Sequence, residues 1–121
     1  MTNDDYQTLA DKLQTVLPDN WEKVVLFVQL EADSYELFFH VLKDGRYESC
    51  FKLGRDEAVS DVFGELYQVM LPDWREKKWS VCTFSWNRDG KFSLEYDYSA
   101  YPDHLKDVLE YKRKWKEKYL A

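Results

Sequence analysis

The sequence has few of the residues that build metal centres and cross-linked scaffolds. Its 121 residues include only two cysteines and two histidines, and Cys50 and Cys82 are too far apart to form a C-x-x-C pair. Structural zinc sites usually draw four ligands from Cys and His residues at short spacings. With only His40 and His104 to complete such a set, we expect no metal ion and no cofactor, and we expect both thiols to be buried.

Long apolar runs and a targeting segment are also lacking. No stretch approaches the roughly 20 apolar residues that a membrane-spanning helix needs, and the first residues, MTNDD, lack the basic start of a signal peptide. We therefore expect a cytoplasmic protein that binds no membrane. The length fits one domain over residues 1–121, because a chain of this size buries enough surface to fold without disulfides or metal.

Basic residues are in the minority, and they are unevenly distributed. The net charge is −6; residues 103–121 hold six basic and four acidic residues, whereas the preceding part holds eleven basic and nineteen acidic ones. An acidic surface disfavours phosphate binding and favours a basic partner. The basic and aromatic run YKRKWKEKY (111–119) could bind nucleic acid. We interpret it as a solvated helix face whose cations complement the helix dipole, and expect no direct nucleic-acid contact.

Three segments have the apolar spacing of amphipathic helices. Apolar side chains recur at three- and four-residue steps from Asp4 to Leu17, from Val59 to Met70 and from Leu105 to Tyr119. A proline follows each of the first two patterns, and proline disrupts a helix interior because it lacks the backbone donor. We therefore predict three helices, of which the second ends before Pro72.

Segments rich in Val, Phe, Leu and Tyr predict strands between these helices. Two of the expected turns, Asp44-Gly45 and Asp89-Gly90, have the sequence of tight hairpin turns. Strands joined by short turns pair antiparallel, so we predict an α+β fold in which an antiparallel sheet of about five strands is flanked by three helices, in the order α-β-β-β-α-β-β-α. The predicted strands are Lys23–Leu30, Tyr35–Leu42, Arg46–Leu53, Trp79–Trp86 and Lys91–Tyr98.

The last of these strands carries two carboxylates, Glu95 and Asp97, beside tyrosines. Because side chains alternate along a strand, both acids face away from the apolar residues Phe92, Leu94 and Tyr96. Paired acids can serve as a catalytic pair or a magnesium site. Since no third ligand, phosphate-binding loop or apolar surrounding accompanies them, we interpret them as surface acids and predict no catalytic residue.

His40 is a second candidate catalytic group. It lies among Phe38, Phe39 and Val41 on a predicted strand. In such a setting we interpret it as a core or edge histidine with one hydrogen bond rather than as a general base.

The order of several pieces resembles the YezG family of bacterial antitoxins, small α+β immunity proteins encoded beside secreted polymorphic toxins. The resemblance covers nearly the whole chain. Its carriers are the helix that ends before Trp21-Glu22-Lys23, the strand Val24-Val25-Leu26-Phe27, the segment from Asp89 to Tyr98, and the closing Trp115-Lys116 to Tyr119-Leu120.

The resemblance implies a non-enzymatic function, namely tight binding to a cognate secreted or contact-delivered toxin domain, often a nuclease. A nuclease is commonly basic because it binds phosphates, so an acidic inhibitor gains association rate. The family supplies no binding motif. We predict the contact residues from charge and aromatic character, with Glu95, Asp97 and Asp103 as acids and Tyr101 and Trp86 as aromatic anchors.

Two other classes of function stay open at this point. One is a small-ligand-binding domain or enzyme with a pocket at the sheet edge. The other is a nucleic-acid adaptor that uses the terminal helix. A bound nucleotide or nucleic acid would favour these classes, whereas one stoichiometric toxin partner would favour immunity.

Overall fold

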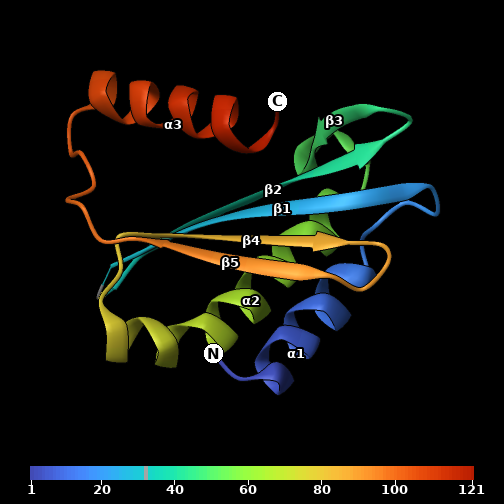
Figure 1. Ribbon diagram of the computed structural model, residues 1–121, viewed down its shortest axis with the longest axis horizontal. Helices are drawn as coiled ribbons and strands as arrows, with labels where there is room; N and C mark the ends of the chain where they lie inside the picture. Colours follow the sequence, from blue (N-terminus) through green and yellow to red (C-terminus); the bar gives the residue numbers. More distant parts are fainter. Residues whose placement is uncertain (32) are drawn as a thin grey trace.

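The computed structural model describes residues 1–31 and 33–121, which form three α-helices, one short 3-10 helix and a five-stranded antiparallel sheet (Figure 1). The strands lie in the order β3-β2-β1-β4-β5. The predicted fold class and element order are therefore confirmed. The elements are α1 (Asn3–Gln14), β1 (Trp21–Leu30), β2 (Tyr35–Lys43), β3 (Arg46–Ser49), the 3-10 helix η1 (Cys50–Lys52), α2 (Asp56–Lys77), β4 (Val81–Asn87), β5 (Phe92–Asp97) and α3 (Leu105–Tyr119).

Strand β1 lies at the centre of the sheet and is apolar on both sides. It pairs antiparallel with β2 and with β4. Val24, Leu26 and Val28 belong to one buried cluster, whereas Val25 and Phe27 belong to another. Since successive side chains of a strand point to opposite faces, these two clusters lie on the two sides of the sheet.

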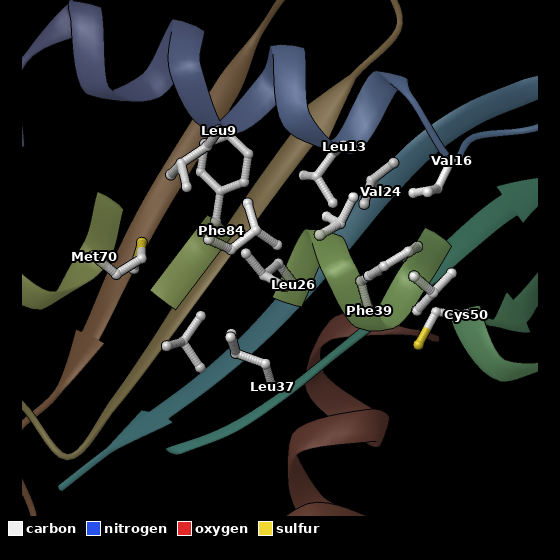
Figure 2. Packing of buried hydrophobic residues seen from close by; sticks show 14 of the residues in the cluster. Leu9, Leu13, Val16, Val24, Leu26, Leu37, Phe39, Cys50, Met70 and Phe84 are labelled. Atoms are coloured by element: carbon white, nitrogen blue, oxygen red, sulfur yellow. The ribbon is translucent and has the colours of Figure 1, made fainter. Parts of the chain in front are cut away.

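The helices divide unequally between those sides. Helices α1 and α2 cover one side, which we call the α1–α2 face, and α3 lies alone over the other, which we call the α3 face (Figure 1). Figure 2 shows Leu9 and Leu13 of α1 beside Val24 and Leu26 of β1 and Phe84 of β4 in the larger cluster. The buried residues of the smaller cluster, on the α3 face, are Val25, Phe27, Val81 and Trp115.

Helix α2 continues through Pro72, so the predicted stop before this proline is wrong. Proline in a helix interior removes one hydrogen bond and costs about 3 kcal/mol. The turn beyond it is held by tertiary contacts, because Asp73 is buried and hydrogen-bonded to other parts of the chain. The helix ends instead at Lys77, and the next residue, Lys78, caps it with a φ of 57° and a backbone N–H that donates to the Trp74 carbonyl at 2.7 Å.

Two other predicted boundaries extend too far. Helix α1 ends at Gln14 rather than Leu17, where the Thr15 hydroxyl donates to the Lys12 carbonyl at 2.7 Å. Strand β3 ends at Ser49 rather than Leu53, where the Ser49 hydroxyl accepts from the Phe51 N–H at 3.3 Å and begins η1. In both places a Ser or Thr side chain competes with the regular backbone pairing.

Candidate partner-binding surface

Glu95 and Asp97 lie on the edge strand β5 and point away from Leu94 and Tyr96, as the alternation of the strand predicts, and on this side they face α3. Asp97 accepts a hydrogen bond from the Tyr111 hydroxyl at 2.7 Å and two from Ser99, through its N–H at 2.9 Å and its hydroxyl at 2.6 Å. Glu95 accepts one from the Tyr119 hydroxyl. The two acids therefore have partners within the chain, and they connect β5 to the helix above it.

The hydrogen bonds keep Asp97 ionised. Partial burial alone would raise its pKa, but the bonds from Ser99 and Tyr111 outweigh this effect and hold the pKa of Asp97 below its usual value. Burial and the neighbouring Asp97 raise the pKa of the Tyr111 hydroxyl, so the shared proton stays on tyrosine. A general acid must hold a proton near neutral pH, and Asp97 does not.

The other three predicted contact residues, Tyr101, Asp103 and Trp86, lie in three different environments. Tyr101 is half-buried on the α3 face, where its hydroxyl donates to Glu36 at 3.4 Å, and burial together with Glu36 raises its pKa to about 12. Asp103 is exposed in the loop before α3. Trp86 points to the opposite face, where its ring centroid lies 4.5 Å from that of Trp21. The structure therefore groups four of the five predicted contact residues around α3 and separates Trp86 from them.

His40 is half-buried on the α3 face, with its ring centroid 5.8 Å from that of Phe38 and 6.4 Å from that of Trp115. Burial, and then the charge of Lys116, lower its pKa to about 4, so the ring is neutral at physiological pH. Its Nδ1 is buried and has no hydrogen-bond partner within residues 1–31 and 33–121. This nitrogen thus lacks the hydrogen bond expected of a core histidine.

Sequence reasoning missed the most elaborate polar cluster, which surrounds Asp73 on the α1–α2 face. The carboxylate accepts from the Met1 ammonium at 3.0 Å, the Trp79 indole at 3.0 Å and the Tyr96 hydroxyl at 2.8 Å, and Lys77 Nζ lies 3.1 Å away. Burial opposes ionisation, but these donors lower the pKa of Asp73 to about 2. Asp73 follows the buried residues Leu66 and Met70 at helical spacing. This spacing indicates that the acid lies on the buried side of α2.

The two helical layers carry opposite charge. From Asp56 to Trp74, α2 has acidic side chains and no lysine or arginine, and α1 has three acids and one lysine. Helix α3 has six basic and three acidic residues. The acidic surface expected from composition therefore lies mainly on the α1–α2 face, whereas Glu95 and Asp97 lie beside the basic helix.

Comparison with known proteins decides the relationship of this chain. A family model described as "Immunity protein YezG-like" matches residues 2–121. The chain belongs to this family of immunity proteins. The resemblance seen in the order of its sequence segments is thereby confirmed.

Three relatives match 77% of this YezG-like chain, in alignments with a length of 106 residues. It is 25% identical to immunity protein YezG of Bacillus spizizenii and 24% identical to immunity protein YezG of Bacillus subtilis, with 66% and 70% of those proteins covered. It is 23% identical to the type VII secretion system protein EsaG of Staphylococcus aureus, of which 65% is covered. The chain thus spans about two thirds of the length of these relatives.

The possible metal ligands and the thiols of this YezG-like protein can be placed among its described residues. Within residues 1–31 and 33–121, no group of three or more His, Cys, Asp or Glu side chains is placed to hold a metal ion. Cys50 and Cys82 are buried free thiols, and burial raises the pKa of both, which disfavours the reactive thiolate. Over the same residues, no helix has the length and apolar character needed to cross a membrane.

Proposed function

We propose that this protein is a bacterial immunity protein that binds a cognate secreted or contact-delivered toxin domain in the cytoplasm. It neutralises the toxin by covering its active or substrate-binding surface and performs no catalysis itself. The observation that carries this proposal is the match of the immunity-protein family over residues 2–121. The names of the two Bacillus relatives agree with it.

We infer that the toxin domain is basic and is a nuclease. Enzymes that cleave nucleic acid bind phosphates through lysine and arginine. A protein with a net charge of −6 is attracted to such a surface over several ångströms, which raises the association rate. The acidic residues of α1 and of the first turns of α2 contribute to this field, and they support the inference.

We also propose that four of the five predicted contact residues bind the toxin. Glu95, Asp97, Tyr101 and Asp103 lie on or beside the α3 face and can meet one partner, whereas Trp86 lies on the other face. Asp97 also stabilises the docking of α3 through Tyr111. A charge reversal at Glu95, which is exposed, therefore tests toxin contact more cleanly than one at Asp97.

Co-expression tests the proposed function. The toxin domain encoded beside this gene is expressed in cells with and without the protein, and survival is measured together with nuclease activity of the purified mixture. We expect the protein to restore growth, to form a stoichiometric complex and to abolish cleavage. Cell death in the presence of folded, soluble protein would contradict the proposal.

The salt dependence of binding tests the role of charge. We expect the association rate to fall several-fold as the ionic strength rises from about 50 to 500 mM, because salt shortens the range of attraction to below about 10 Å. The dissociation rate should change less. An association rate that does not change with salt concentration would contradict the argument for a basic partner. Immunity through an apolar interface would still be possible.

A further inference from the structure

An open groove of about 570 Å³ lies between the C-terminal part of α3 and the strands β2 and β3. Phe38 and His40 of β2 and Tyr47 of β3 line it from the sheet. Lys116 lines it from α3, and Phe51 and Lys52 line it from η1. We call this feature the His40 groove.

The His40 groove is cationic in a protein that is acidic overall. Lys52 and Lys116 form no ion pair with any of residues 1–31 and 33–121. A third lysine, Lys112, pairs with Glu36, the one acid that lines the groove. The groove is therefore lined by two lysines, from η1 and α3, that have no ion-pair partner among the described residues.

His40 makes the groove responsive to an anion. Lys112 and Lys116 of α3, Lys52 of η1, Tyr47 of β3 and Glu36 of the same strand are the charged or titratable groups around it. Burial and Lys116 lower the pKa of His40 to about 4. An anion beside Lys116 would offset the repulsion from this lysine and favour the protonated ring.

The shape and surroundings of the groove favour an acidic side chain over a nucleic acid. A phosphate backbone would extend beyond the two lysines, and the protein as a whole repels it through a net charge of −6. An aspartate or glutamate needs only the groove itself. Phe51, which is 59% exposed at the rim, offers apolar surface to the residues that flank such an acid.

We propose that the His40 groove binds an acidic segment of the toxin domain, with Lys52 and Lys116 holding a carboxylate and Phe51 packing against the flanking residues. This inference rests on the proposed function and specifies one of its contacts. The protein would thus use both negative and positive surfaces to bind the toxin. Its acidic helices attract the basic toxin, and its cationic groove fixes the orientation of the bound toxin.

The first experiment titrates the ¹⁵N-labelled protein with a hexaglutamate peptide and, separately, with a twelve-residue oligothymidylate. We expect saturable NMR shifts at His40 and Phe51 with the peptide, a rise in the pKa of His40, and weaker binding of the oligonucleotide. Lys52→Gln with Lys116→Gln should weaken peptide binding at least fivefold. The matched control is Lys91→Gln with Lys106→Gln, which removes the same charge from exposed lysines outside the groove and should bind like wild type.

Three results of this titration would overturn the proposal. They are equal peptide binding by the two double variants, peptide-induced shifts confined to residues outside the groove, and tighter binding of the oligonucleotide than of the peptide.

The second experiment measures the affinity of the same variants for the toxin domain and the survival that they confer. We expect the groove variant to lose at least tenfold in affinity while the control keeps wild-type affinity. If wild type neutralises the toxin and the groove variant does so equally well, the groove inference is wrong and the proposed function stands. If wild type itself fails to neutralise the toxin, the proposed function is wrong, and the peptide titration alone decides whether the groove binds carboxylates.

Discussion

The two faces of the sheet are built by different means. On the α1–α2 face, two helices bury a large apolar cluster that reaches from Leu9 to Phe84. On the α3 face, one helix docks mainly through Trp115, whose indole donates to the Thr83 hydroxyl at 2.9 Å. Tyrosine–carboxylate hydrogen bonds hold its flanks. Most of the apolar stabilisation therefore comes from the first face.

Under the proposed function, this difference separates the residues that stabilise the fold from those that contact the toxin. A surface that contributes little to the core can change its polar side chains at small cost, because exposed substitutions usually shift stability by less than about 0.5 kcal/mol. The grooves beside α3 and the predicted contacts Glu95 and Tyr101 lie on that less buried side. The α3 face is thus the region where polar side chains can change with little loss of the core.

The largest expected effect compares truncations in the two clusters. Phe84→Ala should lower the free energy of unfolding by about 3–5 kcal/mol, because Phe84 is fully buried under α1. Trp115→Ala should instead release α3 while the sheet and the other helices stay folded. Chemical denaturation gives the global stability, and amide exchange of β1 and α3 locates the change. Equal loss of protection in β1 for both variants would show that the two faces unfold as one unit.

A smaller effect, which depends on pH, is expected at Asp73. The pKa of this acid falls from 3.8 to about 2 on folding, so its ionised form stabilises the protein above about pH 4, and this contribution disappears as pH falls towards 2. At about 1.4 kcal/mol for each pKa unit, Asp73→Asn should cost about 2 kcal/mol at neutral pH and flatten the acid side of the stability curve.

The control for Asp73 is Glu76→Gln on the same helix, because Glu76 is exposed. Thermal melts from pH 2 to pH 7 compare the two variants with wild type. An unchanged acid limb in Asp73→Asn would show that the hydrogen bonds to this carboxylate do not favour its charged form.

The smallest effect is expected at the polar flank of α3. Tyr111→Phe removes the hydroxyl that donates to Asp97 and should cost about 1 kcal/mol, the usual net value of one hydrogen bond. Tyr98→Phe is the matched control, because this side chain is 59% exposed, and it should be nearly neutral. Amide exchange in α3 should quicken only in Tyr111→Phe. Equal exchange in both variants would show that the carboxylates of β5 do not hold the helix.

The sequence by itself determined the elements and the faces of their side chains. The spacing of the apolar residues indicated the three helices, and the alternation along β5 placed Glu95 and Asp97 opposite Leu94 and Tyr96, as the structure shows. These features have a period of two or about three and a half residues, so neighbouring positions are enough to specify them.

Only the tertiary structure decided what these side chains meet. It carried α2 through Pro72, surrounded Asp73 with donors from as far away as Met1, and paired Glu95 and Asp97 with α3. It also divided the charge between the two faces and formed the His40 groove from β2, β3, η1 and α3. Each of these features joins residues that are distant in the chain, and local periodicity specifies the direction of a side chain but not the element that packs against it.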